Sequence, residues 1–330
     1  MKKTAIMMMT VTMASALMGQ VRVQTVTLEK GWNAVWLEVQ PEDATPEEVF
    51  AGADVDMVAG YVKPVSAAQF AKNNAVNVQS LSGWSVWYAP HRADASLSRL
   101  FKLGADAGYL VHALEAAEVT VRGTVSGRAY AWTPNRFNLA GFTVASQGAP
   151  TFGQFFQSSS AHSHDKVYRL HNGAWRQVTN PATEVMRPGE AFWIYCDGAS
   201  AFQGPLSVKA NTPAGLALSG TKVGDVAFVN VARHPVAFTL SLVAGEGNDT
   251  PPMAAVVRSI VPEAEAVTDM PIDFADGAWT QELPVLEAGE AFAIPFVLRV
   301  TAMEKGSQSG LLKITTDLGT ETWVPVRADN

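Results

Sequence analysis

Short apolar runs with interleaved polar positions recur along the whole chain, and glycine, proline, asparagine or aspartate bounds nearly all of them. NAVWLEV (33–39), VTVRGTV (119–125) and AFWIY (191–195) are typical. Each is rich in β-branched and aromatic residues, which favour strands. A helical pattern fits only TPEEVFAG (45–52) and LSRLFKLG (97–104), and both are too short to be stable alone. The pattern therefore predicts an all-β protein with short helices.

The landmarks of the first part of the chain return further along it in the same order. LEKGWNAVWLEV (28–39) aligns with PNRFNLAGFTV (134–144), which places Asn33 opposite Asn138. Likewise, TPEEVF (45–50) matches TFGQFF (151–156), and GYLV (108–111) matches AFWI (191–194). We interpret this as two copies of one β-unit, because chance does not preserve the order of so many landmarks.

The predicted domains follow from this repeat. The first copy covers residues 17–125, with an insertion near residues 62–83, where the second copy has a tight Asn172-Gly173 hairpin. The second copy covers residues 126–206. Each copy is expected to form a small β-sandwich or barrel-like domain with one short helix. Trp32, Val35 and Leu37 are expected in the core of the first.

The repeat does not clearly return in residues 207–330. Instead, runs such as DVAFVNV (225–231), AFAIPFVLRV (291–300) and TETWVPVRA (320–328) follow one another between proline and glycine breaks. About seven such strands in a segment of this length are typical of an immunoglobulin-like β-sandwich. The cysteine pair of antibody domains is absent, because Cys196 is the single cysteine of the chain.

Residues 1–16 have the pattern of a signal peptide that is removed on export. Lys2 and Lys3 precede a mostly apolar stretch (4–13), and Ala14-Ser15-Ala16 fits the small-residue cleavage pattern. The longest apolar run after it is AFAIPFVL (291–298), which is too short to span a bilayer. The sequence therefore predicts an exported protein, in the periplasm, at the cell surface or outside the cell, without a transmembrane segment after cleavage.

Composition narrows the possible partners and chemistry. The formal net charge is −7 and no basic run stands out, so nucleic acid is not expected as a partner. GTVSG (123–127) lacks the spacing of a nucleophile elbow, and GLALSGTK (215–222) lacks that of a phosphate-binding loop. Several neighbouring acids are present, but no scaffold for paired carboxylate catalysis is recognisable. We therefore expect no enzymatic activity and no cofactor.

Two groups of side chains are weak candidates for binding. His162, His164 and Asp165 have the alternating spacing of some metal sites, although a solvated polar loop explains them more simply. Trp84, Trp87 and Trp175 stand near expected strand ends, where exposed rings offer a platform for sugars. Large aromatic residues also fill sandwich cores, and this is the simpler interpretation of the tryptophans.

The motifs also carry a resemblance. GWN (31–33), SGWSVWYAP (82–90), RFNLAGFTV (136–144) and MRPGEAFWIYCDG (186–198) resemble the amino-terminal region of exported bacterial proteins built from such β-repeats, often followed by further β-modules. The resemblance covers residues 26–208. It implies an envelope or extracellular setting and a modular, non-enzymatic role, and it carries over no catalytic residue.

Three functions remain open at this point. The first is a secreted or cell-surface, non-catalytic β-protein with a structural or protein-interaction role, whose partners are envelope or extracellular proteins. The second is a carbohydrate-binding protein that stacks polysaccharide on exposed tryptophans. The third, a glycoside hydrolase or other hydrolase, requires two carboxylates that face each other across a deep cleft.

Overall fold

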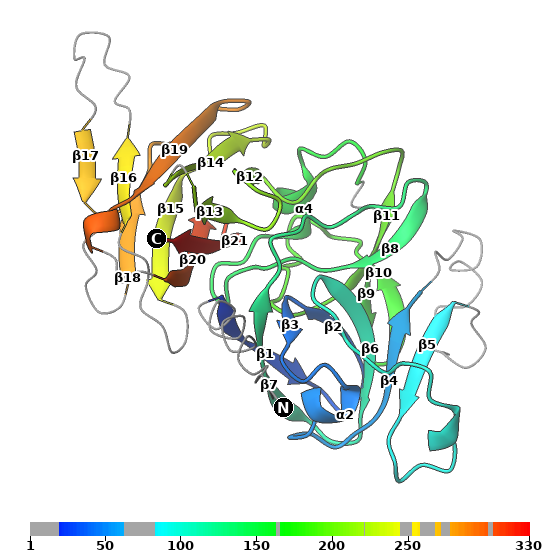
Figure 1. The fold of residues 1–330 in the computed structure, drawn as a ribbon. Coiled ribbons are helices and arrows are strands. Elements are labelled where there is room, and N and C mark those ends of the chain that lie inside the picture. Colours follow the sequence, from blue (N-terminus) through cyan, green and yellow to red (C-terminus); the bar gives the residue numbers. More distant parts are fainter. Residues whose placement is uncertain are drawn as a thin grey trace, which may run out of the picture.

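The chain forms five β-sheets and two short α-helices in the residues that the structure, a computed structural model, describes (Figure 1). These residues are 20–62, 83–162, 166–220, 222–244, 253–257, 268–271, 278–302 and 306–330. The predicted all-β fold class is confirmed. The predicted signal peptide (1–16) and most of the predicted insertion (62–83) lie outside the described residues.

The amino-terminal part of the chain forms two sheets. A three-stranded sheet has the order β1-β7-β3, and a first four-stranded sheet has the order β2-β6-β4-β5. All pairings are antiparallel. The strands are β1 (Val21–Leu28), β2 (Gly31–Leu37), β3 (Val39–Pro41), β4 (Val55–Tyr61), β5 (Trp84–Tyr88), β6 (Ala107–Ala113) and β7 (Ala117–Val125).

A second four-stranded sheet repeats the order of the first. Its strands are β8 (Arg136–Ala140), β9 (Val167–His171), β10 (Ala174–Gln177) and β11 (Phe192–Cys196), in the order β8-β11-β9-β10. The register is also the same, because Asn33 pairs with Val111 in the first sheet and Asn138 pairs with Ile194 in the second. These are the positions aligned in the sequence. The correspondence supports the duplication, which remains our interpretation.

A threonine is the N-cap residue of each of the two described α-helices. Thr45 accepts a hydrogen bond from the backbone N–H of Glu48 at the start of α2 (Pro46–Val49). Thr151 and Gln154 form a reciprocal capping box at the start of α4 (Phe152–Phe156). The other stretch with a helical pattern, residues 97–104, forms no α-helix and holds only the end of the 3₁₀ turn η1 (Ala95–Leu97).

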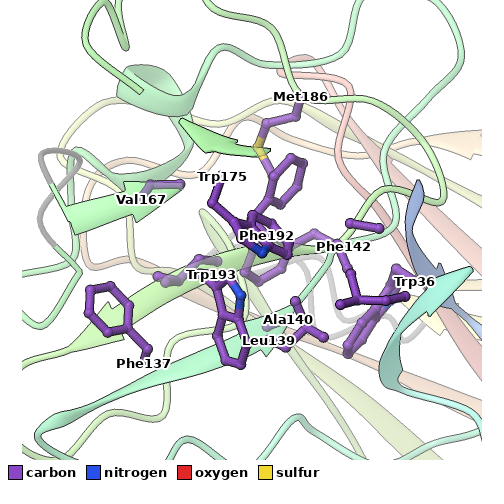
Figure 2. Packing of buried hydrophobic residues seen from close by; sticks show 14 of the residues in the cluster. Trp36, Phe137, Leu139, Ala140, Phe142, Val167, Trp175, Met186, Phe192 and Trp193 are labelled. Atoms are coloured by element: carbon purple, nitrogen blue, oxygen red, sulfur yellow. The ribbon is translucent and has the colours of Figure 1, made fainter. Parts of the chain in front are cut away.

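The first four-stranded sheet is buried on both faces, because alternate residues of each strand enter different cores. Val35 and Leu37 pack against the three-stranded sheet. Ala34 and Trp36 point the other way, into a cluster that includes Leu139, Phe142 and Trp193 of the second copy (Figure 2). Val35 and Leu37 are buried as predicted, and Trp32 is half-buried. The first copy thus has a core of its own between its two sheets, and it shares the second cluster with the second copy, which the sequence did not predict.

The contacts across the shared core are reciprocal. Ala191 donates a backbone hydrogen bond of 2.9 Å to Ala34, and Gly108 lies against Leu139 so closely that an added Cβ would be 2.6 Å from its Cγ. Gly108 and Ala191 occupy equivalent positions in the two copies, as do Ala34 and Leu139. Equivalent faces of the two sheets therefore pack against each other, as in a self-complementary dimer interface.

The carboxy-terminal part is an immunoglobulin-like β-sandwich, as predicted. Figure 1 shows its yellow-to-red strands gathered to one side of the blue-to-green repeats. Its two sheets have the orders β12-β14-β19-β16-β17 and β13-β21-β20-β15-β18. The chain changes sheet between β12, which pairs with β14, and β13, which runs parallel to β21. Phe228, Phe296 and Leu312 lie in its core.

The bounds of these elements are β12 (Leu206–Ala210), β13 (Leu216–Leu218), β14 (Val223–Asn230), β15 (Phe238–Ala244), β16 (Met253–Val257), β17 (Thr268–Pro271), β18 (Ala278–Glu282), β19 (Ala291–Leu298), η3 (Val300–Ala302), β20 (Ser307–Thr316) and β21 (Glu321–Asp329).

Gly141→Ala tests the packing between the two copies. An added Cβ would lie 2.4 Å from Cγ of Trp36 and 2.6 Å from the backbone oxygen of Glu190. We expect this overpacking to lower the free energy of unfolding by about 1 to 3 kcal/mol in urea denaturation. Gly52→Ala is the control, because no atom lies within 4 Å of its added Cβ. Equal stability of the two variants would contradict a tightly packed shared core.

Candidate functional site

A cleft of about 760 Å³ lies where both copies meet the carboxy-terminal sandwich. One wall includes Arg22, Glu38 and Asp106 of the first copy. The second copy contributes Phe142 and its neighbours, and the sandwich contributes residues of β12 and β21. The cleft brings together residues from nearly the whole length of the chain.

Backbone hydrogen bonds fix the sandwich against the second copy. Ala145 donates to the carbonyl of Gly319 at 2.8 Å, and Glu321 donates to the carbonyl of Thr143 at 3.0 Å. Gly319 has φ +72°, and a Cβ there would lie 2.2 Å from the carbonyl oxygen of Gly148, so this turn requires glycine. These bonds set the position of the start of β21, which forms part of the cleft wall.

An ion pair between Arg22 of β1 and Glu38, the residue between β2 and β3, lies in the first wall. The guanidinium of Arg22 also lies 4.9 Å from the ring centroid of Trp323 in β21, so this side chain contacts both walls. Glu38 is buried. Burial raises the pKa of Glu38, and the guanidinium of Arg22 opposes that shift.

Asp106 lies beside this pair, just before β6. Its backbone has φ +53°, a conformation that aspartate and asparagine tolerate better than most residues, and its N–H donates to the carbonyl of Leu37 at 2.8 Å. Burial raises the pKa of the Asp106 carboxyl to about 6, and the charge of Glu38 acts in the same direction. A hydrogen bond with Ser126 and the charge of Arg22 act against the shift.

Three carboxyl groups line the cleft, and the charge of Glu321 on the sandwich wall contributes to raising the pKa of Glu38 on the first wall. Glu38 and Asp106 come from adjacent strand ends of one sheet, so both belong to the same wall. Glu321, which lines the cleft from β21, is paired with Lys313 at 2.8 Å. Hydrolysis of a glycosidic bond requires carboxyl groups that flank the bond. Carboxyl groups thus occur on both walls, and those of Glu38 and Glu321 are each paired with a cation.

The three predicted tryptophans do not form one platform. Trp175 is only 5% exposed and belongs to the shared core, which half-buried Trp84 also contacts. Trp87 packs on the opposite core, because residues three apart in a strand point to opposite faces. The hypothesis of a stacking surface that includes Trp175 is therefore wrong.

His162 is a buried core residue and does not belong to a solvated loop. It is 1% exposed, its ring centroid lies 4.0 Å from that of Trp132, and its Nε2 lies 2.8 Å from Oγ of Ser200. Burial lowers its pKa to about 4, so the ring is neutral at pH 7. His164 and Asp165 lie outside the described residues, within which no group of three or more metal-ligating side chains occurs.

Arg22, Glu38 and Asp106 were not among the residues selected from the sequence. One signal was present, since Glu38 is the only charged residue in the run NAVWLEV. A charged residue at the end of an apolar run is nevertheless common at sheet borders. Its partner Arg22 and the covering Trp323 come from other parts of the chain. Spacing in the sequence does not predict contacts between residues so far apart.

Comparisons with known proteins add little. No protein-family model and no curated protein matches the chain. An Enterococcus faecalis MSCRAMM, described as binding its ligands by the collagen hug model, is similar with a TM-score of 0.21 and 9% identity over 97% of this chain and 93% of that one. For the collagen-binding domain of an Erysipelothrix rhusiopathiae surface protein, the values are 0.18 and 6% over 96% and 88%.

An Amycolatopsis orientalis exo-chitosanase has a TM-score of 0.17 and 9% identity over 93% of this chain and 25% of that one. TM-scores of this size carry no argument about function.

Within the described part of the chain, no helix is both long and apolar enough to cross a membrane.

Asp106→Asn tests the electrostatics of the cleft. Because the folded-state pKa of Asp106 lies above the ordinary value, the neutral carboxyl favours the folded chain. This stabilisation is present below about pH 4 and is lost as the pH rises through about 6. Asparagine keeps the neutral state and tolerates the positive φ. We expect the variant to be more stable than the parent by about 1 to 2 kcal/mol at pH 7.5, and equally stable near pH 4.

Urea denaturation at both pH values measures this difference, with the exposed Glu118→Gln as the control. A variant less stable than the parent at pH 7.5 would show that the ionised carboxylate stabilises the junction.

Proposed function

We propose that this is an exported, non-catalytic β-protein that binds an extended segment of a partner polypeptide in the cleft. The signal-peptide pattern of residues 1–16 supports export. The observation that carries the binding proposal is the free edge of β12, which borders the cleft from Leu206 to Ala210.

The register of β12 shows which of its backbone groups face the free edge. Val231 donates to the carbonyl of Pro205, and residues 205 and 231 are opposite each other in the ladder with β14. In an antiparallel pair, hydrogen-bonded and non-hydrogen-bonded positions alternate. Leu206, Val208 and Ala210 are therefore non-bonded positions, whose N–H and C=O groups point away from β14. In agreement, Asn230, opposite Leu206, donates instead to Glu290 on its other side.

An edge strand of this kind is a template for strand addition. An extended peptide that pairs with it gains main-chain hydrogen bonds, while pockets for alternate side chains give specificity. Within the described residues, β12 has no strand paired to its other edge. The three outward-facing positions are sufficient for one short added strand.

The rest of the cleft suits such a ligand. Its volume lies within the range of ordinary ligand sites. The half-buried Val208 and Ala210 provide apolar surface, and the exposed Lys209 and Arg128 provide polar groups at the rim. Because hydrogen bonds hold the walls in place, little ordering of the protein is needed on binding.

The aromatic groups of the cleft are less suited to stacking a sugar. The ring of Trp323 has the cations of Arg22 and Lys313 at 4.9 Å and 5.2 Å from its centroid. Trp36 is buried in the shared core. The accessible chemistry of the cleft is therefore mainly backbone, apolar and charged, which favours a polypeptide.

Val208→Pro tests the proposal. Proline removes an N–H that points to the free edge, and edge strands tolerate it at such positions. A displayed random-peptide library is panned on the immobilised parent chain, and an enriched peptide is then titrated by calorimetry. We expect the peptide to bind Val208→Pro about tenfold more weakly than the parent.

Val208→Ala is the matched control, because it changes the same side chain and keeps the N–H. It should bind within a few-fold of the parent, and both variants must show the parent's circular dichroism and unfolding midpoint. Failure to enrich any peptide, or equal binding by Val208→Pro, would overturn the proposal.

A further inference from the structure

A second surface, separate from the cleft, is formed by the segment between β5 and β6. Leu97 and Phe101 are 66% and 69% exposed there, although they are large apolar residues. Arg99 and Lys102 lie beside them and are also exposed. We call residues 97–102 the apolar–basic loop. In Figure 1 the chain after β5 runs along the periphery, on the side away from the carboxy-terminal sandwich.

The exposure of these side chains is a fixed feature of the fold. Arg99 and Leu100 donate backbone hydrogen bonds of 2.7 Å and 3.1 Å to the carbonyl of Val86, and Leu103 donates one of 2.6 Å to that of Ala44. Leu100 packs inward, and its Cδ1 would lie 3.2 Å from a Cβ added at Gly60. With Leu100 and Leu103 anchored inside, the side chains of Leu97, Arg99, Phe101 and Lys102 are exposed.

Within its own sequence the segment that holds the loop is positive, although the protein is acidic. Residues 91–103 hold Arg92, Arg99 and Lys102 against one acid, Asp94. Arg92 is paired with Asp94 as well as with Asp56. Arg99 and Lys102 have no ion-pair partner among the residues that the structure describes. Two cations therefore flank Phe101 on a chain whose net charge is −7.

We propose that the apolar–basic loop docks the protein onto a bilayer surface that contains anionic lipid. Leu97 and Phe101 enter the boundary between headgroups and acyl chains, and Arg99 and Lys102 lie near the lipid phosphates. Bulky apolar side chains combined with cations are what interfacial binding requires. A bilayer can accept the ring of Phe101 without a pocket of complementary shape.

The size of the surface favours a bilayer over a protein partner. A stable protein interface buries roughly 800 Å² on each partner and about 20 residues a side. A six-residue loop with two protruding apolar side chains supplies much less. Bilayer contact, in contrast, gains free energy for each apolar side chain inserted and each cation near the surface.

Co-sedimentation with vesicles tests this inference. The mature chain, with its start at Leu17 confirmed by intact mass, is mixed with vesicles of phosphatidylglycerol and phosphatidylcholine in equal parts, or of phosphatidylcholine alone. We expect binding to the mixed vesicles and much weaker binding to the neutral ones. Leu97→Ser/Phe101→Ser and Arg99→Gln/Lys102→Gln should each weaken binding to the mixed vesicles by about tenfold or more.

Val285→Ser is the control, because Val285 is 53% exposed outside this loop. It should bind like the parent, and all variants must have the parent's unfolding midpoint.

No binding to the mixed vesicles, or equal binding by the loop variants, would overturn the inference. So would a concentration-dependent dimer in sedimentation velocity that Leu97→Ser/Phe101→Ser abolishes, because the occupant would then be a second copy of the chain. None of these results bears on peptide binding in the cleft.

Discussion

Burial of the first four-stranded sheet on both faces is the constraint on which the rest of the structure depends. Its strands place alternate residues in two cores, so that Leu37 packs against the three-stranded sheet and Trp36 against the second copy. The two copies thereby form one packed unit. The same packing fixes the strand ends that carry Glu38 and Asp106, and with them one wall of the cleft.

The junction with the carboxy-terminal sandwich builds on this unit. A buried carboxylate such as Glu38 is costly, and its pairing with Arg22 of the same wall offsets part of that cost. Arg22 in turn lies against Trp323 of the sandwich. This chain of contacts links the first copy to the sandwich, whose strand β12 borders the cleft.

Local secondary structure was predictable from the sequence, and the packing of distant segments against one another was not. The β-branched and aromatic residues of the short run NAVWLEV predicted a strand, and the helical pattern of TPEEVFAG predicted a short helix. A strand pattern cannot say what covers each face, so the shared core was missed, although core filling was already the simpler interpretation of Trp175. Residues 97–104 have a helical pattern, but Arg99 and Leu100 donate their backbone hydrogen bonds to Val86 of β5 instead of to a preceding helical turn. The cleft was missed because its parts are far apart in the sequence.

The most direct test of peptide binding in the cleft is residue-resolved amide hydrogen exchange of the chain from Leu17 onward, with and without an enriched peptide. The account predicts that the amides of Leu206, Val208 and Ala210 exchange quickly in the free protein and become protected on binding. Protection confined to other strands, with these three amides unchanged, would contradict it.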